Sequence, residues 1–456
     1  MEVSGKKALV IGAARSGIAS ATFLNQKGAI VALHDQKPLE NWNQDALALR
    51  DAGVGLLPGE LPTWLMDQIE LVVVSPGVPI SGIPIRYMER AGAEVIGEVE
   101  LASRFLKGRI VGITGSNGKT TTTSLIGEIL SDAGFNIQVG GNIGRPLINL
   151  VESSSDESWT VAELSSFQLE TIRQFKPAVA VVLNVTPNHM DRYESFMDYA
   201  AAKHRIFMNQ DAGDVAVLNA DDEVVSSWAS GLRARVIRFS TKQELLEGMF
   251  LRGSRDLVWR DGGAGQVIMK RDEMKLRGLH NVENVLAALA AGMACGAQPE
   301  TMATTVANFN PVEHRLEFVR ELDGVKFYND SKATSVDATL KALEAFRDEP
   351  GQVVLILGGR GKHAPYAPLA SLIKDKVRRL ILIGEDAETI EKELGSFATN
   401  ERVRDMSAAV ERAFAAAESG DTVLLAPACA SFDMFDSFEH RGSVFKELVN
   451  GLRAKR

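Results

Sequence analysis

The sequence has few cysteines, few aromatic residues and no long apolar run. Its 456 residues include two cysteines, Cys295 and Cys429, which are far apart and form no CxxC pair. This cysteine usage is typical of a reducing compartment and argues against a zinc or redox site. No stretch approaches the roughly 20 apolar residues of a membrane span. The apolar run near the N-terminus is too short for a signal peptide, so we expect a cytoplasmic protein.

The chain also has no excess of positive charge. The 50 Lys and Arg residues stand against 59 Asp and Glu, so the formal charge is −9, which invites neither nucleic acid nor anionic lipid. A ligand that carries phosphate must therefore be held by local groups. The length predicts about three domains at roughly 150 residues each. Because the chain contains no heptad pattern, we expect a monomer.

Strand-like runs alternate with helical patterns along the chain, which predicts an α/β protein with parallel sheets. We place domain boundaries near residues 97 and 311, giving domains 1–97, 98–311 and 312–456. The first and third domains are expected to be Rossmann-like, and the central domain to resemble P-loop ATPases. Residues about 240–276 are charged and irregular, and we expect a small β insertion there.

The most informative motif joins a predicted strand at 109–113 to a predicted helix at 120–130. It reads GSNGKT, the shorter GxxGK[ST] form of a phosphate-binding loop. Glycines let backbone N–H groups approach phosphate oxygens, Lys119 adds a positive charge, and the Thr120 hydroxyl can bind Mg²⁺. A plain glycine turn would not need this lysine and threonine. We therefore predict nucleotide binding by Gly115, Ser116, Asn117, Gly118, Lys119, Thr120 and Thr121.

A second glycine loop lies near the N-terminus, where residues 12–17 read GAARSG. It resembles the dinucleotide fingerprint with alanine in place of the middle glycine. Taken alone, the loop allows an NAD-dependent oxidoreductase, and simple helix–strand packing is nearly as good an explanation. The missing glycine crowds the approach of a pyrophosphate and favours another nucleotide-like ligand. Asp35 ends the next predicted strand, where its carboxylate could accept hydrogens from a ribose or a base.

Polar residues follow several other predicted strands. Glu163 ends one strand and is a candidate metal ligand, and His189 follows another strand at the same edge of the sheet. Lys203 lies in a predicted helix, and by itself this position indicates a surface charge. Asn281 and Asn284 share one helical face, where they could contact adenine, although Asn281 could equally be a helix cap.

The third segment contains NDSKAT at residues 329–334, between a predicted strand and a predicted helix. Asp330 could bind ribose hydroxyls, and Thr334 could bind a carboxylate. Lys332 could stabilise negative charge that develops during a reaction. An ordinary N-cap cluster would explain the Asp or Ser but not the lysine between them. Residues 358–362 and 427–431 end two further strands, at the edge where α/β sheets bind ligands.

Taken together, these motifs resemble the Mur ligases over essentially the full chain. NDSKAT and PACASFDMFDSFEHRG are most similar to the member that adds D-glutamate to UDP-N-acetylmuramoyl-L-alanine. The resemblance implies an ADP-forming amide ligase of bacterial peptidoglycan synthesis that uses ATP and two Mg²⁺ ions and passes through an acyl phosphate. Other Mur-type or folylpolyglutamate-type ligases remain alternatives. An NAD-dependent oxidoreductase and a non-catalytic nucleotide-binding regulator are the alternatives from other classes.

The resemblance also implies a role for individual residues. Because ATP and the amino acid are then expected on different domains, we expect a hinge near Pro311 and Arg315 that lets the domains close. Lys203 is implied to be carbamylated, which turns a cation into a metal ligand. Arg360 occupies a position that is often acidic in relatives. The implied catalytic residues are Lys119, His189, Lys203 and Lys332, and the implied metal ligands are Thr120, Glu163, His189 and Lys203. The residues implied to contact the nucleotide are Asn281, Asn284, Arg315 and Asp330. Those implied to contact the UDP-linked substrate are Ser16, Asp35, Gly77, Asn142, Ser165 and Ser166. Those implied to contact the amino acid are Thr334, Lys362, Ser431 and Phe438.

Overall fold

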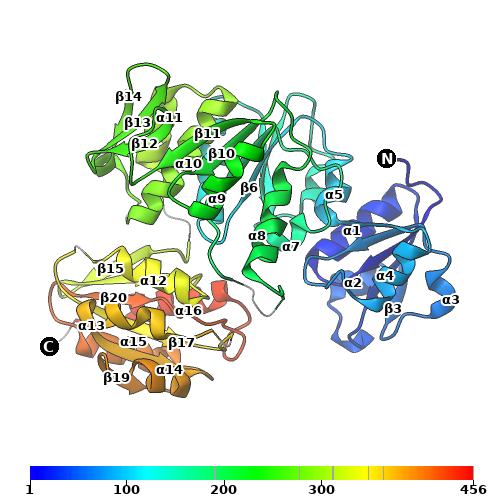
Figure 1. The fold of residues 1–456 in the computed structure, drawn as a ribbon. Helices are drawn as coiled ribbons and strands as arrows, with labels where there is room; N and C mark the ends of the chain where they lie inside the picture. Colours follow the sequence, from blue (N-terminus) through cyan, green and yellow to red (C-terminus); the bar gives the residue numbers. More distant parts are fainter. Residues whose placement is uncertain (189–191, 277, 311–312, 348, 363, 455–456) are drawn as a thin grey trace. The chain divides into compact units, whose positions relative to one another are not determined.

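The computed structural model describes residues 1–188, 192–276, 278–310, 313–347, 349–362 and 364–454. Three sheets follow one another along the chain (Figure 1). The chain forms two compact units, Met1–Met274 with Glu283–Asn308, and Lys275–Val282 with Phe309–Arg456. The first two sheets belong to the first unit and the third sheet to the second. The expected hinge residue Pro311 lies outside the described residues, and the boundaries at 97 and 311 stay predictions.

The first sheet is parallel throughout and has the strand order β3-β2-β1-β4-β5. Its strands are β1 (Lys7–Ile11), β2 (Ile30–Asp35), β3 (Gly55–Pro58), β4 (Leu71–Val74) and β5 (Glu94–Gly97), and its helices are α1 (Arg15–Gln26), α2 (Gln44–Ala48), α3 (Thr63–Met66), α4 (Ile83–Arg90) and α5 (Glu98–Ser103). The four residues of β4, LVVV, are all buried, as expected of a strand with both faces covered. The order reverses beside β1, and ligands of such sheets bind at this switch point.

The second sheet has nine strands in the order β14-β13-β12-β11-β10-β9-β6-β8-β7. The strands are β6 (Arg109–Thr114), β7 (Ile137–Gly141), β8 (Trp159–Glu163), β9 (Val179–Val182), β10 (Val215–Asn219), β11 (Arg235–Ser240), β12 (Glu247–Arg252), β13 (Asp256–Asp261) and β14 (Gln266–Lys270). The helices are α6 (Lys119–Asp132), α7 (Ser166–Leu169), α8 (Phe196–His204), α9 (Glu223–Ser227), α10 (Leu279–Cys295) and α11 (Pro299–Asn308). The expected β insertion is present as β12–β14, which pair antiparallel with one another and extend this sheet.

The third sheet has the order β15-β16-β20-β17-β18-β19. Its strands are β15 (Glu317–Leu322), β16 (Val325–Asn329), β17 (Val353–Gly358), β18 (Val377–Ile383), β19 (Thr399–Arg402) and β20 (Thr422–Leu425). Its helices are α12 (Val336–Glu344), α13 (Ala370–Lys376), α14 (Ala387–Leu394), α15 (Met406–Ala416) and α16 (Phe438–Gly451). The edge strand β15 pairs antiparallel and the other strands pair parallel. The predicted α/β class with parallel sheets is thus confirmed.

The cores are built from aliphatic side chains on these strands. All six residues of β17, VVLILG, are buried, and its neighbour β20 is buried throughout. Such continuous apolar runs are typical of central parallel strands that are covered on both faces. Of the helices in the described ranges, none combines the length and the hydropathy that a membrane crossing needs.

Candidate active site

The phosphate loop follows β6 in the first unit, and neighbouring side chains fix its backbone. The Asn117 N–H donates to Asn184 Oδ1 at 2.8 Å, and the Ser116 N–H donates to the Asn184 carbonyl at 2.9 Å. Gly118 has a φ of +83°, a left-handed conformation that favours glycine, and a Cβ there would overlap with Asn284 Oδ1. Helix α6 begins at the next residue, so the loop ends at a helix N-terminus suited to an anion.

Two lysines meet at this loop. Lys119 Nζ donates to the Gly115 and Ser116 carbonyls at 2.8 and 2.9 Å, and Lys203 Nζ donates to the same Gly115 carbonyl at 2.8 Å. Lys203 is 1% exposed. Burial, and then the charge of Lys119, lower its pKa well below the ordinary value, while Glu163 opposes the shift. The surface position predicted from its helix alone is therefore wrong, because α8 turns this side chain toward the phosphate loop.

Glu163 ends β8 next to β6 and offers an oxygen for a cation. Its Oε1 accepts a hydrogen bond from Asn142 Nδ2 at 2.8 Å, whereas its Oε2 is buried without a hydrogen-bond partner. A buried carboxylate oxygen without a partner is costly unless a ligand compensates it. Mg²⁺ prefers oxygen ligands and often takes only one or two from the protein, the rest being substrate phosphate and water. Glu163, together with the Thr120 hydroxyl in the first turn of α6, therefore fits a Mg²⁺ site.

The other implied metal ligand, His189, lies outside the described residues. Among the residues that the structure does describe, no group of three or more His, Cys, Asp or Glu side chains is arranged to hold a metal ion.

Ser116 links the phosphate loop to α8, since its Oγ lies 3.0 Å from Tyr199 Oη and accepts the Thr186 N–H at 2.9 Å. The loop is thus braced from two neighbouring segments.

The glycine loop of the first sheet has its own internal contacts. Asp35 Oδ2 accepts the Ala13 N–H at 2.9 Å, and its other oxygen accepts a second backbone N–H at 3.0 Å. Ser75 Oγ donates to the Gly12 carbonyl at 3.1 Å, and a Cβ on Gly17 would overlap with that carbonyl. This tight packing explains the glycines without a dinucleotide. The carboxylate expected at a ribose or base also shapes the loop itself.

Arg192 contacts the loop after β4, a role that the sequence argument did not assign. Its guanidinium donates to the Gly77 and Val78 carbonyls, both at 3.2 Å, and forms an ion pair with Glu170 at 3.4 Å. The side chain of Glu170 is only 14% exposed, so this ion pair is largely shielded from solvent. More than 110 residues separate Arg192 from the carbonyls, and no local pattern could have indicated this contact.

The remaining residues implied for the UDP-linked substrate lie on the same unit. Ser165 Oγ caps α7 by accepting the Gln168 N–H at 3.2 Å, and Ser166 begins that helix and is buried. Asn142 is exposed and turns its amide toward Glu163. Ser16 is half-buried in the first turn of α1. The capping of α7 gives Ser165 a structural function beside any contact with substrate.

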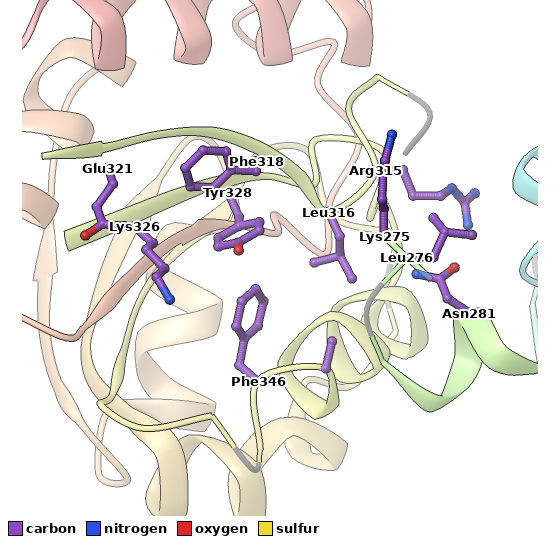
Figure 2. A pocket seen from close by; sticks show the side chains of 11 residues that line it. Lys275, Leu276, Asn281, Arg315, Leu316, Phe318, Glu321, Lys326, Tyr328 and Phe346 are labelled. Atoms are coloured by element: carbon purple, nitrogen blue, oxygen red, sulfur yellow. The ribbon is translucent and has the colours of Figure 1, made fainter. Parts of the chain in front are cut away.

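The second unit contains a cavity of about 290 Å³ beside Asn281 and Arg315 (Figure 2). One wall is aromatic: the Tyr328 ring lies 5.5 Å from that of Phe318 and 5.0 Å from that of Phe346, centroid to centroid. The remaining lining residues are Lys275, Leu276, Leu316, Glu321, Lys326 and Ala345. Aromatic rings beside an amide and a guanidinium suit a flat, polar-edged base.

Asn281 and Asn284, predicted on one helical face, fall in different units. Asn281 lines the cavity of the second unit. Asn284 belongs to the first unit, where its amide packs against Gly118. Helix α10 therefore contributes to both units, and one of the two asparagines supports the phosphate loop directly.

The segment around Arg315 is conformationally strained. His314 and Leu316, on either side of it, have φ values of +62° and +42°. Left-handed conformations are unfavourable for such residues and cluster at functional sites. Asn329 Nδ2 lies 2.9 Å from His314 Nδ1 and helps to hold this shape. Next to it, Asp330 is buried, and burial raises the pKa of its carboxyl to about 7, although the charge of Arg315 opposes the shift.

A buried arginine joins the two loops implied to bind the amino acid and nucleotide. Arg441 donates to Ser331 Oγ and the Ser331 carbonyl at 2.9 and 2.8 Å, and to the Cys429 carbonyl at 3.2 Å. Burial lowers its pKa to about 10. Lys332 Nζ lies 5.3 Å from the centroid of the Phe438 ring. No local sequence pattern indicates a role for Arg441, because its partners come from distant segments.

The other residues implied for the amino acid lie at the same sheet edge. The Thr334 N–H donates to the Lys332 carbonyl at 2.8 Å, and Ser431 is buried in the loop after β20. Lys362 is exposed in the loop after β17. Arg360, in that loop, pairs with both oxygens of Glu385 at 2.9 Å. This ion pair gives a structural reason for a basic residue at a position that is often acidic.

Comparisons with known proteins cover the whole of this architecture. Residues 6–97 match the Mur ligase MurD-like N-terminal domain, residues 113–292 the Mur ligase middle domain, and residues 314–429 the Mur ligase glutamate ligase domain. In solved structures, the MurF ligase of Thermotoga maritima in complex with ADP is similar, with a TM-score of 0.61 and 16% identity over 98% of this chain and 96% of that one. At this identity the likeness concerns the fold alone.

Two relatives are similar along their entire length. Both bear the name UDP-N-acetylmuramoylalanine–D-glutamate ligase. The protein from Solibacter usitatus is 50% identical over 458 residues, covering 100% of each chain. The protein from Acidobacterium capsulatum is 47% identical over 451 residues, covering 98% of this chain and 97% of its own. The chain belongs to the Mur ligase family.

Proposed function

We propose that this chain is an ATP-dependent ligase that forms the amide bond between D-glutamate and UDP-N-acetylmuramoyl-L-alanine. Two relatives that carry this name match over at least 97% of their length at 47–50% identity. The reaction belongs to the synthesis of bacterial peptidoglycan precursors, so we place the enzyme in the cytoplasm. The observation that carries the chemistry is the phosphate loop, where Lys119 and Lys203 meet at one carbonyl.

The chemical problem is that a carboxylate reacts poorly with an amine, since its oxygen is a poor leaving group. In the proposed reaction, a carboxylate oxygen of the L-alanyl group attacks the γ-phosphorus of ATP, and ADP leaves. The amine of D-glutamate then attacks the carbonyl carbon of the acyl phosphate. Phosphate departs from the tetrahedral intermediate with the former carboxylate oxygen, and the amine loses a proton.

The residues of the phosphate loop would position the phosphoryl groups. Backbone N–H groups from Gly115 to Thr120 lie at the N-terminus of α6, which favours negative charge. Lys119 would turn from its present carbonyl partners to the phosphate oxygens and neutralise the charge that develops on them. Electrostatic stabilisation of this kind is usually the largest single catalytic contribution, and losing one such contact costs roughly a hundred- to a thousand-fold in rate.

Bound Mg²⁺ would supply further neutralisation of phosphoryl charge, and we propose two ions. Glu163 would hold one through its partnerless Oε2, with the Thr120 hydroxyl as a neighbouring oxygen. Asn142 keeps the Glu163 carboxylate in place through the 2.8 Å hydrogen bond to Oε1. Lys203 would become a carbamate, for which its buried amine is suited, because only the uncharged amine reacts with carbon dioxide.

Residues of the second unit would hold the rest of the nucleotide and the amino acid. The cavity beside Asn281 and Arg315 suits adenine, and Asp330 would accept hydrogens from the ribose. We assign Lys332, Thr334 and Lys362 to the carboxylates of D-glutamate and to the acyl phosphate. Ser431 and Phe438 would complete the amino-acid site at the same edge of the third sheet.

Phosphate release tests this function. The purified chain is incubated with Mg²⁺, ATP and UDP-N-acetylmuramoyl-L-alanine, together with D-glutamate, L-glutamate, lysine or diaminopimelate in separate reactions. We expect release with D-glutamate and rates at least a hundredfold lower with the others. Lys119→Ala is the negative control, and Lys107→Ala, which changes an exposed lysine of the same unit, is its matched positive control. Release that depends equally on another amino acid, or no release at all, contradicts the proposal.

A further inference from the structure

The loops that follow β17, β18 and β20 meet at one edge of the third sheet. The Gly358 N–H donates to the Pro427 carbonyl at 2.9 Å, and Arg360 and Ala430 exchange backbone hydrogen bonds of 2.9 and 3.0 Å. The Asp386 N–H donates to the Gly359 carbonyl at 3.0 Å. These main-chain contacts tie the segment that carries Lys362 to the segment that carries Ser431. Both residues belong to the amino-acid site proposed above.

One buried side chain links the three loops. Tyr366 is 2% exposed, and its hydroxyl donates a hydrogen bond to Asp386 Oδ2 in the loop after β18. The same hydroxyl oxygen lies 3.0 Å from the Sγ of Cys429, in the loop after β20. Burial raises the pKa of the Cys429 thiol to about 11, so the thiol keeps its proton and can donate it to the phenol oxygen. Cys429 thus donates to Tyr366, Tyr366 donates to Asp386, and the Asp386 carboxylate is the final acceptor.

The position of Asp386 shows that this hydrogen bond shapes the site. Asp386 is the N-cap residue of α14, but its side chain does not cap that helix. Asp405, the N-cap of α15, accepts the Ala408 N–H at 2.9 Å in the usual way. The carboxylate of Asp386 is instead turned to Tyr366. It also packs against the main chain next to Lys362, since a Cβ on Gly361 would overlap with it.

We propose that Tyr366 is a positioning residue for the amino-acid substrate, whose hydroxyl fixes the Lys362 loop against the Ser431 loop through Asp386 and Cys429. The inference rests on the proposed function, because it assumes that these two loops hold D-glutamate. The aromatic ring of Tyr366 already fills the core. The hydroxyl adds the hydrogen bonds to Asp386 and Cys429, and these hydrogen bonds control the affinity for the amino-acid substrate.

Tyr366→Phe tests the inference, because it removes one oxygen and keeps the ring. We expect the KM for D-glutamate to rise about tenfold, as fits the loss of one hydrogen bond to a charged group. The KM values for ATP and for the UDP-linked substrate should stay within twofold, as should kcat at saturating D-glutamate. Asp386→Asn, which removes the charge of the acceptor, should raise the same KM in the same direction.

Tyr87→Phe is the matched control, since Tyr87 Oη donates to Asp67 at 2.6 Å on the exposed surface of the first unit. It should change none of the three KM values. Unchanged D-glutamate affinity in Tyr366→Phe, or an equal rise in all three KM values, would overturn the positioning role. If the unmodified chain itself releases no phosphate with D-glutamate, the proposed function fails instead. The two failures are therefore distinguishable.

Discussion

At the scale of single residues, the most informative side chain is Lys203, a buried amine whose pKa lies well below its ordinary value. Desolvation disfavours the charged form of a lysine, and a nearby cation adds to this effect. Between its folded pKa and the ordinary lysine pKa of 10.5, the unfolded chain binds the proton more tightly than the folded one. Stability therefore rises with pH across this window, and Lys203 lowers stability most at the acidic end.

Lys203→Met should consequently stabilise the chain while it abolishes ligation. In carbon-dioxide-free buffer at pH 7, we expect a higher melting temperature. Each kcal/mol added to the free energy of unfolding should raise it by about 2–4 °C for a domain of this size. This gain in melting temperature should shrink between pH 7 and pH 9, because burying the wild-type amine destabilises the folded chain less as the pH rises. Lys107→Met is the control and should give no gain that depends on pH. A variant that melts lower than wild type at pH 7 would contradict the account.

At the scale of elements, the phosphate loop and α6 can be tested by two glycines of nearly equal φ. Gly118 and Gly134, at the two ends of α6, have φ values of +83° and +85°. A Cβ on Gly118 would overlap with Asn284 Oδ1, whereas a Cβ on Gly134 would meet no atom within 4 Å. Both alanine variants carry the same backbone strain, of roughly 1–2 kcal/mol, because an L residue is placed in the left-handed region. Their difference therefore isolates the contact between the loop and α10.

Gly118→Ala should reduce kcat/KM for ATP by about a hundredfold or more, since a displacement of about 1 Å at the loop is enough for such a loss. Gly134→Ala should keep its kcat/KM within twofold. Circular dichroism and thermal unfolding show whether both variants are folded. Equal activity of the two variants would mean that the loop tolerates the shift and that its geometry does not control ATP turnover.

The local signals in the sequence were strong for buried parallel strands and for glycine loops. The strand predicted at residues 109–113 is β6 (Arg109–Thr114) in the structure, and the helix after the phosphate loop differs by one or two residues at its ends. Edge strands were harder to predict, and no strand was predicted at β15, whose residues are all exposed or half-buried. A half-exposed edge strand lacks the continuous apolar run that identifies a central one.

Side-chain roles that depend on distant contacts could not be predicted. The burial of Lys203 requires the Gly115 carbonyl, 88 residues away, and the role of Arg441 requires Ser331, 110 residues away. No helical or strand period contains that information. The residues of the phosphate loop were predictable because glycine, lysine and threonine serve one ligand within six consecutive positions. Tyr366 gave no signal, because its partners come from two other loops.

At the scale of the whole molecule, we propose phosphate-binding residues in the first unit and amino-acid-binding residues in the second. One reaction must use both sets, so the order of chemical steps concerns the entire chain. An acyl phosphate is the species that connects them, because it is formed with ATP and consumed by the amino acid. Water must be kept from it during this interval, as closure of an active site accomplishes in other enzymes.

Isotope transfer from the carboxylate to the released phosphate shows whether an acyl phosphate forms. UDP-N-acetylmuramoyl-L-alanine labelled with ¹⁸O at both oxygens of the alanyl carboxylate is converted in the presence of ATP, Mg²⁺ and D-glutamate, and the released phosphate is analysed by mass spectrometry. The account predicts one ¹⁸O atom in each phosphate molecule, because the carboxylate oxygen attacks the γ-phosphorus and leaves with it. Phosphate without label, formed while the amide product accumulates, would contradict the acyl-phosphate route.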